Sequence, residues 1–355
     1  MMVRWIAALV TFVLVAAIGL VVGNFEGEGA ANTWALVAAI GLGVAFAVYA
    51  AIEYAQTGGF ASISRQFGIR TLALMPVAIA INIIMGAAVA NALKIPIYLD
   101  SIGTILVGAL AGPIPGALTG FVANILWQYV IPPPFQGTIA APFAIVAAVI
   151  GLLAGIFARS GALRPRPDRP MGQLLGGAFI TVIVIGGVAW LAFLGYQRII
   201  GPTAFEVASD NALFVVLGWV ALLLVVATVV GLLALLFVRR DLTAAYVVVA
   251  GLVTGIIAAL ISAPISANLF SGVTGSGTDF LVAAFRQAGV DIGAATLGQG
   301  LISDPIDKII TFFVVYLILT AMAPRMKSRF PQGDRLVERV ATTPTEDGEW
   351  REASA

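Results

Sequence analysis

Residues 100–131 read DSIGTILVGALAGPIPGALTGFVANILWQYVI, which is two short apolar runs on either side of a turn. The turn is Gly112-Pro113-Ile114-Pro115-Gly116, and glycine and proline in this combination are a strong signal for chain reversal. We expect helices at about 100–112 and 116–131 that form a tight hairpin. Since an apolar helix needs about 20 residues to cross a bilayer, both arms are short for that task.

The rest of the chain surrounds this hairpin with longer apolar segments. Hydrophobic residues make up 60% of the 355 residues and charged residues 10%, and the mean hydropathy is +1.04. Soluble domains contain about 25% charged residues, so this composition excludes a soluble enzyme, a disordered chain and a nucleic-acid binder. It indicates an all-α polytopic membrane protein.

The apolar segments predict about ten transmembrane helices. They lie at about 4–22, 34–52, 71–92, 100–112, 116–131, 138–158, 172–196, 212–238, 243–265 and 305–323. The first is longer than the roughly 7–15 apolar residues of a signal peptide, and no A-x-A site follows Gly23. We therefore expect it to be retained.

The distribution of Lys and Arg predicts the orientation. If the N-terminus is cytoplasmic and ten helices alternate, fifteen of the 19 basic residues fall on the cytoplasmic side. The four on the outer side are Lys94, Arg198, Arg286 and Lys308. This split follows the positive-inside rule and predicts a multi-pass protein of the cell (plasma) membrane with both termini cytoplasmic. The polar tail, 326–355, is expected to be disordered.

Polar side chains inside apolar segments mark either hydrogen bonds between helices or a binding site. Asn124 and Gln128 are four residues apart, so they share one face of a helix, and Trp127 lies beside them near the outer end. Asn82 is explained equally well by bonding between helices and by contact with a ligand.

Two acidic positions begin apolar segments on the outer side. Asp100 fits a helix N-cap and also a ligand contact, and Tyr98 fits an interfacial ring. Asp304 and Pro305 fit the N-cap and first position of a helix. Lys308 has no such structural explanation, so it snorkels, pairs with Asp304 or Asp307, or meets an anionic ligand, and the local ion pair is favoured.

The longest outer loop is expected between Ser266 and Asp304. A loop of this length usually carries function or structure of its own, and apolar residues predict a short helix at 280–285. Its glycine-rich run, GVTGSGTD at 272–279, has no lysine after it and therefore cannot be a phosphate loop.

Several of these segments resemble the substrate-binding S component of energy-coupling factor (ECF) transporters, which are ABC-type importers of vitamins. The resemblance rests on PIYLDSIGTIL at 96–106, GALTGFVAN at 116–124, SAP at 262–264, GVTGSG at 272–277 and DPIDKII at 304–310. It covers about 71–158 and 243–325. It implies a six-helix core and three partners, which are a transmembrane coupling subunit and two cytoplasmic ATPases.

The resemblance divides the chain into five parts. They are an added helix pair at 1–60, four core helices at 65–160, an inserted pair at 172–238, the last two core helices with the long outer loop at 243–325, and the tail at 326–355. The family pocket carries over to Tyr98, Asp100, Asn268, Asp304 and Lys308, with Asn124, Trp127 and Gln128 added from their position. The surface that docks the coupling subunit carries over to Ala73, Ala78 and Ala80, although these alanines lack the family's four-residue spacing.

The sequence thus predicts a binding protein in the membrane rather than an enzyme. It contains no His, no Cys and no nucleotide-binding motif, which removes imidazole and thiol chemistry, the usual metal sites and a cofactor signature. The predicted ligand is a small, vitamin-like, cationic or neutral molecule, because acidic residues outnumber basic ones on the outer side. The alternative is a membrane sensor that acts on a separate partner. An ion-coupled transporter fits less well, because the helix centres lack carboxylates.

Overall fold

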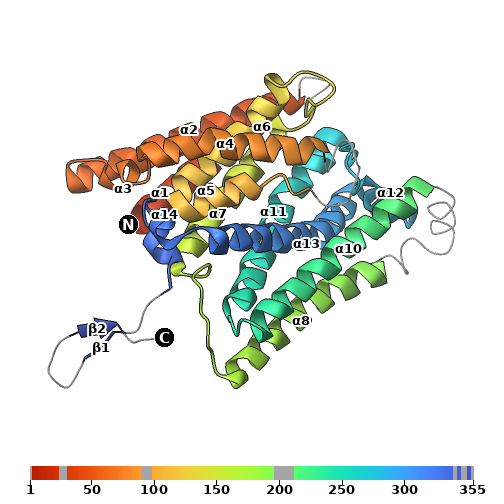
Figure 1. The fold of residues 1–355 in the computed structure, drawn as a ribbon. Coiled ribbons are helices and arrows are strands. Elements are labelled where there is room, and N and C mark those ends of the chain that lie inside the picture. The colour runs from red at the N-terminus through yellow and green to blue at the C-terminus, as the bar shows by residue number, and fades with distance from the viewer. Residues whose placement is uncertain are drawn as a thin grey trace.

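The computed structural model describes residues 2–23, 30–88, 98–195, 212–338, 342–344 and 350–352, and these are almost entirely helical (Figure 1). The longer helices are α1 (Met2–Val22), α2 (Ala30–Thr57), α4 (Ile69–Met85), α5 (Ile102–Ala111), α6 (Pro113–Tyr129), α7 (Ala144–Ser160), α8 (Met171–Gly195), α10 (Ala212–Phe237), α11 (Thr243–Phe270), α12 (Asp279–Gln287) and α13 (Ile292–Ala321). The short elements are α3 (Ala61–Ser64), η3 (Ala141–Phe143), α14 (Pro324–Lys327), η5 (Gly333–Leu336) and the antiparallel strands β1 (Thr342–Pro344) and β2 (Trp350–Glu352).

The prediction of a helical membrane protein is confirmed at the level of composition and length. Among the described residues, five segments are long and apolar enough to cross a bilayer: 3–22, 30–57, 69–88, 141–160 and 243–270. The last four residues of the predicted span 71–92 lie outside the described residues.

The predicted hairpin forms as α5 and α6, joined at Gly112. Gly112 has φ 132°, which a glycine adopts without strain, and Pro113 occupies the first turn of α6, where its missing N–H costs nothing. All ten residues of α5 are buried, and the helix packs against α4, α6 and α7. At about 1.5 Å per residue, α5 is about 15 Å long, roughly half the thickness of a bilayer core.

Glycines allow these central helices to pack backbone to backbone. Gly108 of α5, Gly116 of α6 and Gly151 of α7 meet at one point, where a side chain on any of them would collide with the backbone of another. Gly251 and Gly255 of α11 lie in the same way against Ile309 and Pro305 of α13. Small residues at helix crossings are typical of membrane proteins, because they permit close van der Waals contact.

The prediction that the last helix begins at Asp304-Pro305 is wrong. α13 begins at Ile292, and its N-cap is Asp291, whose Oδ1 accepts from the N–H of Ala294 at 3.0 Å. Pro305 therefore lies inside the helix, beside the bare backbone of Gly255. Because α11 also continues to Phe270, the predicted loop 266–304 is mostly helical. The short helix expected at 280–285 is present as α12.

Two helix pairs flank the central helices on different sides. Figure 1 shows α8 and α10 side by side, and both contact α11 and α13. α1 packs along α2, and α2 contacts η3 and α7. These are the segments that the resemblance assigned to added and inserted pairs.

Residues 328–338, from the tail that was expected to be disordered, pack against the central helices. The N–H of Gln332 donates to the carbonyl of Leu110 at 2.9 Å, and its side-chain amide donates to the carbonyl of Gly108 at 3.0 Å. These carbonyls belong to the last turn of α5, where carbonyl groups run out of helical partners; that of Gly108 also accepts from the N–H of Gly112. Leu336 is also buried. Residues 328–338 therefore pack on the end of the hairpin, where Gln332 supplies hydrogen-bond donors to the carbonyls of α5.

Candidate functional site

A cavity of about 260 Å³ lies between α6, α7, α11 and α13, next to the segment that leads into α5. Six of the eight predicted ligand-binding residues line it: Tyr98, Asp100, Asn124, Trp127, Asp304 and Lys308. The two remaining candidates do not line it. Segments more than two hundred residues apart in the sequence thus converge on one site.

The short length of α5 explains why there is room for a cavity. α5 begins at Ile102, and Ser101, just before it, lines the cavity wall. The neighbouring helix α13 has 30 residues, or about 45 Å at 1.5 Å per residue, so it extends far beyond α5. If α5 were as long as α13, it would fill the space that the cavity occupies.

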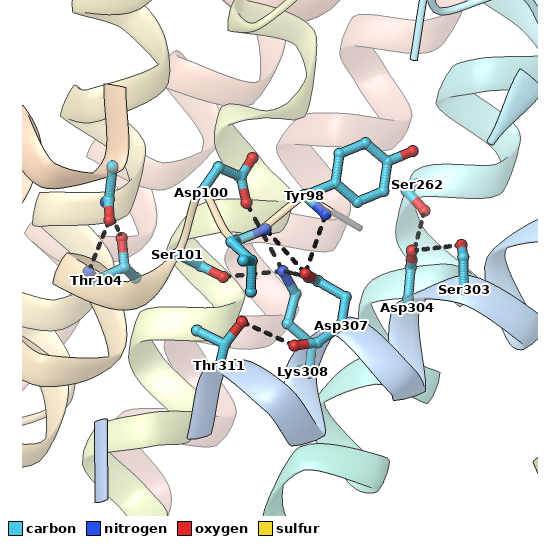
Figure 2. A network of polar contacts seen from close by, with 12 residues as sticks. Tyr98, Asp100, Ser101, Thr104, Ser262, Ser303, Asp304, Asp307, Lys308 and Thr311 are labelled. Carbon is cyan, nitrogen blue, oxygen red and sulfur yellow. Dashed lines mark hydrogen bonds and ion pairs between the residues drawn. The ribbon is translucent and has the colours of Figure 1, made fainter. Parts of the chain in front are cut away.

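Lys308 is the centre of a buried polar network (Figure 2). Its Nζ lies 2.5 Å from Oδ2 of Asp307, 2.9 Å from Oγ of Ser101 and 3.8 Å from Oδ1 of Asp100. Lys308 is 4% exposed and Asp307 fully buried. The expected pairing of Lys308 with a neighbouring carboxylate is therefore confirmed, and its main partner is Asp307.

Asp307 also holds the non-helical backbone before α5. Its Oδ1 accepts from the N–H groups of Tyr98 at 3.1 Å and Leu99 at 2.9 Å. Leu99 has φ 53°, in the left-handed region that non-glycine residues seldom adopt. Backbone N–H groups away from water need hydrogen-bond acceptors, and Asp307 supplies one from α13.

Asn82 caps the start of α5 from the neighbouring helix α4. Its Oδ1 accepts from the N–H of Gly103 at 2.8 Å, and its Nδ2 donates to Oγ1 of Thr104 at 2.7 Å. Of the two explanations for Asn82, bonding between helices is the one that the structure shows.

The N-cap explanations of Asp100 and Asp304 are both wrong. The N-cap of α5 is Ser101, so Asp100 precedes it and turns its carboxylate toward Lys308. Asp304 lies in the middle of α13. Figure 2 shows it to one side of Lys308, where Oγ of Ser303 donates at 3.2 Å and Oγ of Ser262 at 3.5 Å.

Tyr98 connects the cavity wall to the loop between α11 and α12. Its hydroxyl lies 2.8 Å from Oγ1 of Thr278 and 3.3 Å from Oγ of Ser276. In the same loop, the Asp279 carboxylate accepts from the N–H groups of Thr274 at 2.9 Å and Gly275 at 2.6 Å. Burial raises the pKa of the Tyr98 phenol, so the hydroxyl stays protonated and available for these hydrogen bonds.

We expect Tyr98→Phe to loosen this loop without unfolding the protein. One lost hydrogen bond costs about 0.5–1.5 kcal/mol, so amide exchange at 274–275 should become about 2- to 10-fold faster. Hydrogen–deuterium exchange with mass spectrometry measures this. Tyr54→Phe on the exposed face of α2 is the control. Unchanged exchange in Tyr98→Phe would show that the hydroxyl does not hold the loop.

Gln128 and Asn268 have local structural contacts instead of a place in the cavity. Gln128 Oε1 accepts from the N–H of Ala141 at 2.6 Å, and Asn268 is exposed and donates to the carbonyl of Pro264 at 2.8 Å. Neither residue lines this cavity.

The three alanines assigned to partner docking differ in their exposure to solvent. Ala73 and Ala80 are exposed on α4, but Ala78 is fully buried against Gly103 of α5. Ala78 therefore cannot contact a partner, because it forms the close crossing of α4 and α5.

The sequence analysis missed several hydroxyl and amide residues on the cavity wall. They are Ser101, Ser262, Ser266, Thr274, Ser276 and Gln299. Ser262 and Ser266 are four residues apart and share a helix face, which is a signal that the sequence contained. Gln299 was assigned to a loop, so its helical neighbours were not considered.

Basic residues gather at the ends of the helices opposite to the cavity. Arg164 donates to the carbonyl of Arg335, Arg335 to that of Arg159, and Arg70 to that of Arg329. Arg159 and Arg164 lie at the C-terminal end of α7, whose other end contributes Val146 and Ile150 to the cavity. The molecule thus has a cavity end and an arginine-rich end.

Within the described ranges, no group of three or more His, Cys, Asp or Glu residues is placed to hold a metal ion. No family model, no curated protein and no solved structure matches the chain.

Proposed function

We propose that the chain is the membrane-embedded substrate-binding subunit of an ECF-type importer. It captures a small, vitamin-like molecule in the cavity between α6, α7, α11 and α13. The core of this S component would be α4–α7, α11 and α13, with α1/α2 and α8/α10 as additions. ATP hydrolysis belongs to partner subunits.

The observation that carries the proposal is the cavity itself. It combines apolar walls with a few converging polar groups, which is the usual make-up of a small-molecule site. It lies at the end of the helices away from the arginines. Under the positive-inside rule the arginine-rich end is cytoplasmic, so the cavity faces the outside. Ten membrane spans with both termini inside are the topology that this proposal requires.

The experiment is a mild-detergent pull-down of the tagged chain from its native membranes, followed by mass spectrometry. Retention of two ABC-type ATPases and a second membrane subunit supports the proposal. Retention of a kinase or another regulator, without ATPases, contradicts it and favours a sensor. A variant of the chain tests the docking face. Ala73 lies on the exposed face of α4, so Ala73→Trp should reduce retention of the membrane subunit if this face docks it.

A further inference from the structure

Asp304 is a buried carboxylate on the cavity wall without a cationic partner. It is 8% exposed, and its hydrogen-bond donors are the hydroxyls of Ser262 and Ser303. Ion pairs within the described ranges are Arg4–Glu53, Lys308–Asp100 and Lys308–Asp307, so no basic nitrogen lies within 4.0 Å of Asp304. A buried charge is normally paired or bound to a metal.

Lys308 compensates Asp304 only in part, because its charge is shared with Asp307 and Asp100. Its Nζ contacts Asp307 at 2.5 Å and Ser101 at 2.9 Å, with Asp100 at 3.8 Å. The site thus contains one ammonium group and three carboxylates: Asp100 and Asp307 contact Lys308, and Figure 2 shows Asp304 to one side of it. With all of them ionised, the site has an excess of negative charge that favours a positively charged occupant.

Asn124 is a second, independent indication of a polar ligand. It is 8% exposed, it lines the same cavity from α6, and its amide makes no hydrogen bond within the described ranges. Because the amide has donors and an acceptor, it can bond to many polar groups of a ligand.

The size and walls of the cavity restrict the ligand further. A volume of about 260 Å³ corresponds to roughly nine water molecules in the liquid. Trp127 and Phe143 form part of the wall, and aromatic faces attract cations. A metal ion would need several oxygen ligands from the protein. Among the described residues, no group of three or more His, Cys, Asp or Glu residues is placed to hold one.

We infer that the cavity binds a small organic monocation, whose charged nitrogen donates hydrogen bonds to the Asp304 carboxylate while a second polar group pairs with Asn124. This inference rests on the proposed function, since it defines the substrate class of the same site. Asp304 then selects for charge, and the rings and apolar walls select for shape.

The test compares cations with neutral molecules of the same shape. The probes are benzamidine with benzamide, and 2-phenylethylamine with 2-phenylethanol. Binding to the full-length chain in nanodiscs is measured as ligand-induced thermal stabilisation over a concentration series at pH 7. We expect each cation to bind more tightly than its neutral counterpart. Asp304→Asn should lower cation affinity about 10- to 100-fold and leave the neutral probes unchanged, because a charged hydrogen bond is lost.

Asp291→Asn is the matched control, since Asp291 lies on the same helix outside the cavity. It should leave all four affinities unchanged. Equal binding of cations and neutral probes, unchanged cation binding in Asp304→Asn, or no binding of either cation would overturn the inference. Stabilisation by NaCl alone that Asp304→Asn abolishes would overturn it in favour of an inorganic cation. None of these outcomes affects the pull-down, so failure of the charge inference can be told from failure of the proposed function.

Discussion

Asp307→Ala should destabilise the protein by about 3–5 kcal/mol, because it leaves the buried Lys308 without its main counter-ion. The substitution also removes the acceptor of the Tyr98 and Leu99 N–H groups. These groups lie in the irregular segment before α5, which has no helical hydrogen bonds of its own. The measurement is unfolding of the purified chain in mixed micelles with increasing SDS, monitored by tryptophan fluorescence.

Three further variants separate the charge from the hydrogen bonds. Asp307→Asn keeps an acceptor for the two N–H groups, so its loss should be smaller than that of Asp307→Ala. The double change Asp307→Leu with Lys308→Met removes both charges and should recover part of the loss, because no unpaired charge remains. Asp291→Ala removes only a helix cap and should cost about 0.5–2 kcal/mol. A loss in Asp307→Ala no larger than this control would contradict the role of Asp307.

The sequence was sufficient to predict several cavity-lining residues because charge is rare in this chain. With only 10% charged residues, Asp100, Asp304 and Lys308 stand out from apolar surroundings, and all three line the cavity. Asn124 was predicted from the helix face that it shares with Gln128, and Trp127 from its place beside them; Asn124 and Trp127 line the cavity, and Gln128 does not. The hairpin was predictable because glycine and proline define its turn locally.

The sequence was not sufficient where distant segments decide the structure. Residues 292–304 contain Gly293, Gly298 and Gly300, which indicate a loop. In the fold, Gly300 packs against Ala259 and Pro305 against Gly255, so α11 supports a continuous helix there. Gln332 looked like part of a disordered tail for the same reason, since its partners are carbonyls of α5 more than two hundred residues earlier.

Gly151→Val should separate α6 from α7 and remove ligand binding along with stability. A Cβ at Gly151 would lie 2.7 Å from the backbone nitrogen of Ala117 and still closer to the carbonyl of Gly116. Backbone atoms cannot move aside as a side chain can, so we expect a cost at or above the upper end of the usual 1–3 kcal/mol for overpacking. Both helices also form the cavity, through Asn124 and Trp127 on α6 and the neighbouring Ile150 on α7.

Gly43→Val is the matched control for this substitution, because Gly43 lies within α2 and has no atom within 4 Å of its Cβ position. Valine has the higher helix propensity, so this variant should be as stable as the natural protein or slightly more stable. Thermal unfolding in nanodiscs, with and without benzamidine, measures both variants. If Gly151→Val unfolds at the same temperature as Gly43→Val, the close packing of α6 and α7 is wrong. If it unfolds earlier but binds benzamidine normally, the cavity does not depend on this crossing. Loss of both properties is the expected result, because one contact between helix backbones sets the spacing of the walls that the ligand occupies.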